Sequence, residues 1–397
     1  MNPSKKVYQE NSYLTTLEAE VLSCNKINDL YEVILDKTIF YPHMSGGQPK
    51  DKGTINGIEV SNVIENGEKI IHVISEPLNG TVSLEIDFET RFDYMQQHTG
   101  QHILSCTFDD LYNGKTIGFH LSSDSTTIDL DINLTDNMLE RVEIYANQII
   151  YDNINITAQT LPYNDALKLN LRKTPPKLDF LRILEIHNKD IIACGGTHVK
   201  STGEIGVIKI VKVEKYKTGV RVEFLCGKRA LNDYILRHRD IMKLSALLTC
   251  KADMIFDNFN KIKIENKELK KNIISQQNEI NDYKAEELKN NVLLKNNIKY
   301  IFQKLDVTDI KDLRFICSKA IQGKDYVAVL ICETNTTCSI CLGQSDNLNF
   351  DIKGIFEQCK KIINAHGGGN NKLIQGTGNI LNKSEECINI AKSLLII

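Results

Sequence analysis

Three observations predict that this chain is an α+β protein built from successive domains. Strand-like alternation near the N-terminus gives way to helical periodicity at about residue 91. A stretch without proline or glycine then runs from 231 to 295, and strand and helix patterns alternate over the last hundred residues. The expected units are a β-barrel-like module with a glycine-rich loop (1–90), an α+β domain (91–230), a helical, coiled-coil-like linker (231–297) and a small α/β domain (298–397).

The overall composition is that of an ordinary soluble globular chain, with 42% hydrophobic and 25% charged residues. The net charge of −3 gives no bulk signal for nucleic-acid binding, so such a partner would need a local basic surface. The N-terminus lacks the apolar core of a signal peptide, and no run approaches the roughly 20 apolar residues of a membrane span. The 11 cysteines have no regular spacing. We therefore expect a cytoplasmic protein with reduced thiols and no membrane association.

In the N-terminal module, strands are expected at 31–35, 70–74 and 82–88, where apolar residues alternate or form short runs. The segment between the first two, Tyr41 to Pro49, contains two prolines and two glycines and is expected to be a loop. Its glycine-rich part is either a ligand-binding loop or an ordinary hairpin turn.

The α+β domain is expected to begin with a helix from about Arg91, since apolar residues recur there every three to five positions. Strands follow at 128–132 and 183–186, and a hairpin pairs 207–213 with 220–224.

The linker carries apolar residues at alternating three- and four-residue steps, the spacing of a coiled-coil seam. Asn266 and Gln276 interrupt this seam. Two interpretations stay open: a dimerisation or spacer arm, and a helical hairpin that folds back on its own domain. The apolar positions are Phe259, Ile262, Leu269, Ile273, Ile280 and Tyr283.

The C-terminal domain is expected to contain strands at 300–305, 326–332 and 337–342 and helices at 309–319 and 352–365. A glycine-rich segment, Gly367 to Gly378, and a final apolar helix complete it.

Two separate motifs predict a metal site. His98 and His102 are four positions apart, which places both imidazoles on one helix face about 6 Å apart. Cys194 and His198 flank two glycines that permit a tight bend. Either pair alone is weak evidence, but together the four residues form a plausible ligand set for one Zn²⁺ per chain. Four protein ligands suit a structural zinc, whereas catalysis needs an open position, and the sequence leaves this choice open.

Two further features qualify the metal site. Gly100 lies between the two histidines, where glycine costs about 1 kcal/mol relative to alanine. This indicates a close approach to the helix, either by a substrate or by a packed strand. A zinc protease is excluded because Thr99 stands where that class has its glutamate, and the His-x-Glu and Pro-Cys-x-x-Cys motifs of zinc deaminases do not occur.

The motifs Arg91-Phe-Asp-Tyr-Met-Gln-Gln-His-Thr-Gly-Gln-His102 and Cys194-Gly-Gly-Thr-His198 resemble the two zinc motifs of the alanyl-tRNA synthetase editing domain. Leu35 to Pro42 and Ser45 to Pro49 resemble the glycine-rich segment of that family's N-terminal β domain. The Gly367 to Gly378 segment is similar to the glycine-rich end of its DHHA1 domain. The resemblance covers nearly the whole chain in the same order, so the chain is identified as a member of the long, free-standing alanyl-tRNA editing proteins (AlaX type).

This resemblance implies a hydrolase that serves translation fidelity by deacylating tRNA(Ala) charged with serine, sometimes with glycine, and that recognises the acceptor stem. It implies zinc ligation by His98, His102, Cys194 and His198. Aminoacylation is not expected, because a synthetase would need several hundred further residues upstream.

Other site residues follow from the same resemblance. Thr38 matches the threonine associated with the hydroxyl of serine, and a site built around a hydroxyl rejects analogues that lack it. The alternative for Thr38 is an ordinary strand threonine. Gly46, Gly47 and Gln48 match the loop that approaches the 3′-terminal nucleotide. Gly367, Gly368 and Gly369 are the corresponding tRNA-contact candidates of the C-terminal domain.

For the chemistry, Zn²⁺ has three candidate roles: activating a water, polarising the ester carbonyl, or anchoring the terminal adenosine. We favour water activation. Asp93, one turn before His98, is a candidate for orienting a ligand. Two other hypotheses stay open: an editing module of the threonyl type, and a non-catalytic tRNA-binding protein with a structural zinc. A DHH phosphoesterase is excluded, because the chain has no Asp-His-His triplet. A homodimer formed through the C-terminal half is also expected.

Overall fold

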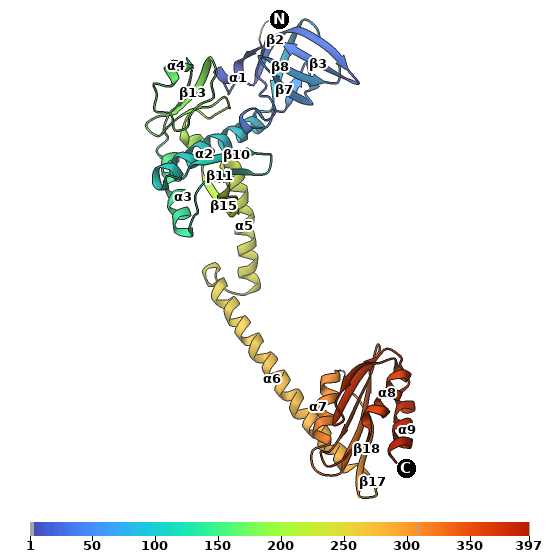
Figure 1. Cartoon of the computed structure of the whole chain (residues 1–397). Coiled ribbons are helices and arrows are strands. Elements are labelled where there is room, and N and C mark those ends of the chain that lie inside the picture. Colours follow the sequence, from blue (N-terminus) through green and yellow to red (C-terminus); the bar gives the residue numbers. More distant parts are fainter. Residues whose placement is uncertain (1–3, 308, 397) are drawn as a thin grey trace. The chain divides into compact units, whose positions relative to one another are not determined.

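The computed structural model describes residues 4–307 and 309–396. The chain divides into two compact units, Met1–Lys243 and Leu244–Ile397. Each unit contains both helices and sheets, as the α+β prediction requires (Figure 1). Among the described residues, no helix combines the length and the apolar character that crossing a membrane requires.

The N-terminal module is a seven-stranded sheet in the order β6-β5-β9-β2-β3-β8-β7. Its longest strand, β2, pairs with β9 through its first half and with β3 through its second half, with a register shift between Val21 and Ser23. Such a shift bends a strand, and residues from both halves share one core. Within the described residues, edge strands β6 and β7 do not pair, so the predicted barrel-like module is a bent, open sheet. The bounds are β2 (Thr16–Ile27), β3 (Leu30–Leu35), β5 (Gly53–Ile55), β6 (Ile58–Glu59), β7 (Asn62–Asn66), β8 (Lys69–Ile74) and β9 (Thr81–Ile86).

A short N-terminal segment adds to this module. Strand β1 (Lys5–Lys6) pairs in parallel with β4 (Lys37–Thr38), and the one-turn helix α1 (Val7–Glu10) follows it.

Helix α2 (Phe88–Tyr112) is the centre of the first unit. It begins at the N-cap Asp87, whose side chain accepts hydrogen bonds from the backbone N–H groups of Glu89 and Thr90. It ends at Asn113, which adopts a left-handed conformation. The helix is buried over most of its length between Arg91 and Phe108, so it shows only a weak apolar stripe in the sequence.

The rest of the first unit contains two sheets, α3 (Asp136–Tyr151), the one-turn helix α4 (Tyr163–Ala166) and most of α5 (Gly227–Leu247). Helix α3 packs against α2 and shares its core. The four-stranded sheet β10-β11-β16-β15 contains the predicted hairpin, with its turn between Tyr216 and Gly219. The three-stranded sheet β12-β13-β14 leads directly into the Cys194 to His198 segment. The bounds are β10 (Thr116–Leu121), β11 (Thr126–Leu130), β12 (Ile156–Pro162), β13 (Phe180–Ile186), β14 (Asp190–Ala193), β15 (Ile208–Tyr216) and β16 (Gly219–Cys226).

The stretch predicted to be a helical linker contains two helices, α5 (Gly227–Leu247) and α6 (Ile255–Asn290). Between them Thr249 has φ 48°, a left-handed conformation that no glycine or proline announces. The boundary between the compact units falls after Lys243, inside α5. The last turns of α6 bury Ala285 and Leu288 in the C-terminal core. The division into two units thus falls within the linker predicted at 231–297, and the four-domain organisation stays a prediction.

The C-terminal unit contains a six-stranded sheet in the order β17-β18-β19-β20-β22-β21. Strand β19 sends Val327, Val329 and Ile331 into the core with α8 and α9, and the alternate residues into a second core with α6 and α7. Helices therefore cover both faces of this sheet. The bounds are β17 (Leu293–Lys295), β18 (Ile298–Leu305), α7 (Ile310–Ala320), β19 (Tyr326–Glu333), β20 (Cys338–Gln344), α8 (Ile352–Ile363), β21 (His366–Gly369), β22 (Leu373–Gly378) and α9 (Ser384–Leu395).

Candidate metal centre and active site

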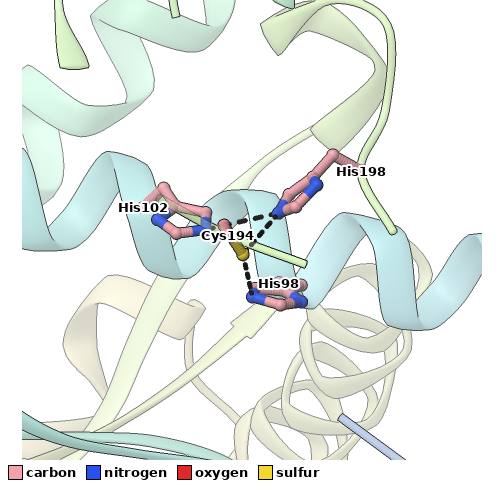
Figure 2. A group of neighbouring side chains, drawn as sticks. All are labelled: His98, His102, Cys194 and His198. Carbon is pink, nitrogen blue, oxygen red and sulfur yellow. Dashed lines mark hydrogen bonds between the residues drawn. The ribbon is translucent and has the colours of Figure 1, made fainter. Parts of the chain in front are cut away.

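The four predicted metal ligands come together at one point. His98 and His102 lie on α2 with their rings stacked 5.2 Å apart, and Cys194 and His198 reach them from the segment after β14 (Figure 2). One side-chain nitrogen or sulfur from each residue lies within 4.8 Å of all the others. The three imidazoles are buried and the thiol is half-buried.

Three of the distances between the four ligand atoms match those of a tetrahedral zinc site. Cys194 Sγ lies 3.4 Å from both His98 Nε2 and His198 Nε2, and His198 Nε2 lies 3.3 Å from His102 Nε2. Zinc bonds of about 2.0–2.1 Å to nitrogen and about 2.3 Å to sulfur place tetrahedral ligands about 3.3–3.6 Å apart. Three imidazoles and one thiolate also match the ligand chemistry of Zn²⁺.

Burial sets the protonation of the ligands. It lowers the pKa of His98 to about 3, and it lowers the pKa values of His102 and His198 well below their usual value. The imidazoles are therefore neutral at physiological pH, as metal coordination requires. Burial also raises the pKa of the Cys194 thiol, while the backbone N–H of Gly196 and the charge of Arg182 act in the opposite direction. A bound cation would favour the thiolate further.

The Cys194 to His198 segment is held closely against α2. A Cβ atom on Gly196 would lie 2.2 Å from His98 Cε1, so only glycine fits there. Arg182 on β13 donates from Nη1 to the backbone oxygens of Cys194 and Gly196, both at 3.0 Å. The guanidinium thus fixes the turn that presents the thiol. Arg182 was not identified from the sequence, because no motif in the neighbouring residues marks it as part of a site.

Packing against a strand explains the glycine at position 100. A Cβ atom there would lie 2.2 Å from Cys226 Sγ on β16, so the close approach to α2 comes from a strand and not from a substrate.

Gln48 connects the glycine-rich loop to the metal ligands. Its Oε1 lies 2.9 Å from His98 Nδ1, and its Nε2 donates to Thr197 Oγ1 at 2.8 Å. With His98 Nε2 directed at the other ligands, Nδ1 carries the proton and donates to Gln48. A partner of this kind fixes the tautomer and orientation of a metal-binding imidazole.

The loop itself is a short 3₁₀ turn, Ser45–Gly47, rather than a hairpin turn. Gly46 and Gly47 have φ values of 59° and 82°, where glycine is favoured. A Cβ atom on Gly47 would lie 3.3 Å from the ring of Phe119, and that ring is 5.2 Å from the ring of His98. The glycine-rich loop therefore lies beside the metal site.

Thr38 is fully buried in the N-terminal module. Because His72 Nδ1 faces the Val33 carbonyl at 3.2 Å, the Thr38 hydroxyl donates to His72 Nε2 at 2.8 Å. It also accepts a hydrogen bond from the Phe40 N–H at 3.1 Å. Burial lowers the pKa of His72 to about 4, so this partner is neutral. The hydroxyl proton of Thr38 is thus engaged within the protein. His72 was not identified from the sequence.

Asp93 was predicted to orient a metal ligand, but its carboxylate has other partners. Its carboxylate receives Arg229 Nη2 at 2.6 Å and Gln97 Nε2 at 3.3 Å, and it makes no hydrogen bond to a metal-binding histidine within the described residues. Asp93 and His98 are five residues, or about 1.4 helical turns, apart, so they lie on different faces of α2. Asp93 therefore meets Arg229 of α5, and Gln48 lies beside His98.

The three C-terminal candidates, Gly367, Gly368 and Gly369, belong to the second compact unit. They form the edge strand β21 and pair with β22.

Comparisons with known proteins agree with this site. Residues 181–223, which include Cys194 and His198, match the threonyl and alanyl tRNA synthetase second additional domain. Alanyl-tRNA editing protein AlaX-L of Pyrococcus horikoshii is 30% identical, over 98% of this chain and 97% of that protein.

Two further relatives extend the comparison. Alanyl-tRNA editing protein Aarsd1 of Bos taurus is 31% identical, over 71% of this chain and 68% of that protein. The alanine–tRNA ligase of Pyrococcus abyssi is 27% identical over 99% of this chain, which spans only 44% of the ligase. Because it matches AlaX-L over nearly the whole length of both proteins, the chain belongs to the family of alanyl-tRNA editing proteins.

Proposed function

We propose that this protein is a zinc-dependent deacylase that hydrolyses tRNA(Ala) mischarged with serine, and with glycine to a lesser degree. The observation that carries the proposal is the single cluster of His98, His102, Cys194 and His198 beside the glycine-rich loop, in a chain of this family. The second additional domain is shared with threonyl enzymes, but the relatives that match across most of this chain are named for alanyl-tRNA.

Each residue has a defined task in this proposal. A zinc ion bound by the four ligands would supply Lewis acidity at the ester. Gln48 holds His98 in one tautomer and carries the glycine-rich loop to the site. Gly46 and Gly47 keep that loop free of side chains, so the 3′ end of the tRNA can approach its backbone N–H groups. Thr38 would select serine through its hydroxyl after exchanging its bond to His72.

The first prediction concerns substrate choice. Zinc-loaded full-length protein is expected to hydrolyse Ser-tRNA(Ala) rapidly, Gly-tRNA(Ala) more slowly, and to leave Ala-tRNA(Ala) and Thr-charged tRNA intact. Replacing Thr38 with valine removes the hydroxyl and is expected to lower kcat/KM for Ser-tRNA(Ala) by about tenfold or more, with a smaller effect on Gly-tRNA(Ala). The measurement is release of labelled amino acid, with tRNA in each charged form.

Equal losses on the serine and glycine substrates would show that Thr38 serves only the packing of the module. Preferential hydrolysis of Thr-charged tRNA would replace the alanyl assignment with a threonyl one. A protein that binds zinc and tRNA but hydrolyses none of the four substrates would be a non-catalytic tRNA-binding protein.

We also propose that α6 pairs with the α6 of a second copy. With Asn266 and Gln276 included, the seam positions alternate in steps of three and four residues. The apolar residues of the seam are about half exposed or more, so the described residues of the same chain do not cover them. A helix with such a seam is stabilised by a partner helix with the same repeat. Asn266 and Gln276 would fix the register of the pair.

The second prediction follows from this seam. Light scattering on the full chain is expected to give twice the chain mass of 45.0 kDa, and Ile273→Asp is expected to give the single-chain mass. Lys271→Asp, on the outer face of the same helix, is the matched control and should leave the dimer intact. A single-chain mass for the unmodified protein at micromolar concentration contradicts the pairing.

A further inference from the structure

A polar cavity of about 300 Å³ borders the metal-binding segment on the side of β12 and β13. His198 and the two residues after it form part of its wall, so the cavity begins at a metal ligand. None of the other residues in its wall was among the site residues predicted from the sequence.

Two strands and one loop build the cavity. Strands β12 and β13 are antiparallel, with Thr160 opposite Arg182 and Ala158 opposite Leu184, so these four side chains share one face of the sheet. Residues 9–13, which follow α1, form the facing wall. Arg182 Nε donates to the backbone oxygen of Gln9 at 3.2 Å, which joins the two walls.

The cavity is positively charged. Arg182 uses Nε and Nη1 to hold backbone oxygens, and its Nη2 makes no hydrogen bond to the residues that the structure describes. The Lys200 ammonium lies 4.2 Å from the centre of the Tyr13 ring and forms no ion pair with a described residue. The one carboxylate in the wall, that of Glu10, lies 3.1 Å from Lys5 Nζ. Two cationic groups with donors to spare therefore remain for a ligand.

We infer that this cavity binds the phosphate of the 3′-terminal nucleotide of the tRNA, through Arg182 and Lys200. The inference rests on the proposed function for the identity of the substrate. The ester to be hydrolysed is on the ribose of that nucleotide. The phosphate is attached to the 5′ position of the same ribose, so it lies only a few bonds from the ester. An ester at the metal ligands therefore brings this phosphate to a cavity bordered by His198. A guanidinium is well suited to hold a phosphate, and an ammonium adds a second positive charge.

The test compares two uncharged tRNA(Ala) probes, one intact and one lacking its terminal adenosine and hence this phosphate. Their affinities for zinc-loaded full-length protein are measured at several salt concentrations. Lys200→Ala is the variant of choice, because Lys200 is exposed, whereas Arg182 also supports the metal-binding segment. It is expected to weaken binding of the intact tRNA about fivefold to tenfold. It is also expected to reduce the salt slope by about one, as for the loss of one phosphate contact.

The shortened tRNA is expected to bind Lys200→Ala and the unmodified protein equally well. Lys200→Arg should restore both affinity and salt slope, which a purely structural role would not require. Lys168→Ala, which removes an exposed lysine paired with Asp165, is the matched control. Equal losses on both tRNAs, or no loss on either, would overturn the inference. These are affinities of uncharged tRNA, so they stand apart from deacylation, whose absence would overturn the proposed function instead.

Discussion

Replacing Cys194 with alanine is expected to abolish both zinc binding and deacylation. The substitution removes the one ligand with a negative charge and leaves three neutral imidazoles in a buried site. Loss of an outer hydrogen-bond partner typically lowers metal affinity 10- to 100-fold, so loss of a ligand should cost more than about 100-fold. The expected result is a fall from one zinc per chain to almost none, with kcat/KM for Ser-tRNA(Ala) lower by more than about 100-fold.

Metal content is measured by elemental analysis after gel filtration, and hydrolysis by release of labelled serine. Cys24→Ala is the matched control, because Cys24 is also half-buried but lies in β2, outside the ligand set. That variant should keep both zinc and activity. Unchanged hydrolysis by Cys194→Ala in metal-free buffer would remove zinc from the mechanism, and zinc retained without activity in the unmodified protein would make it structural.

The second large effect is expected at Arg91, where α2 enters the N-terminal module. The Arg91 and Asp51 side chains are both fully buried and form a two-pronged ion pair. Arg91 also donates to the backbone oxygens of Ser12 at 2.9 Å and Ile39 at 2.6 Å. One guanidinium therefore joins three segments that lie far apart in the sequence.

Arg91→Met is expected to lower the free energy of unfolding by about 3–5 kcal/mol, because it leaves the Asp51 carboxylate buried without its partner. At about 2–4 °C per kcal/mol for a unit of this size, the Tm of the N-terminal unit should fall by about 10 °C. Differential scanning calorimetry of the full chain measures this change.

An exposed ion pair between α2 and α5 supplies the control. Lys228 on α5 and Glu89 on α2 lie 3.3 Å apart, and Lys228→Met should change stability by less than about 1 kcal/mol. The double variant Arg91→Met, Asp51→Leu should lose less than the single variant, since it buries no unpaired charge. A single variant as stable as the Lys228 variant would mean that the buried pair contributes nothing.

Secondary-structure elements were predictable where the apolar pattern of the sequence matches the burial of the side chains. Strands β3, β8 and β9 and the hairpin of β15 and β16 lie within a few residues of their expected positions, because each shows either alternation or a short apolar run. Strand β12 and helix α3 were not predicted. The break between α5 and α6 was invisible, because Thr249 adopts a left-handed conformation without glycine or proline.

The sequence by itself predicted the candidate metal ligands, because the two residues of each pair are four positions apart and their types are those that commonly bind zinc. The tertiary structure alone decided their surroundings. Gln48 lies 50 residues from His98, Arg182 acts through backbone oxygens, and Thr38 is matched with His72 across two strands. Such partners are set by how distant segments pack, and packing leaves no periodic signal in the chain. The same limit explains Asp93, where spacing along the helix suggested a histidine partner and packing supplied Arg229.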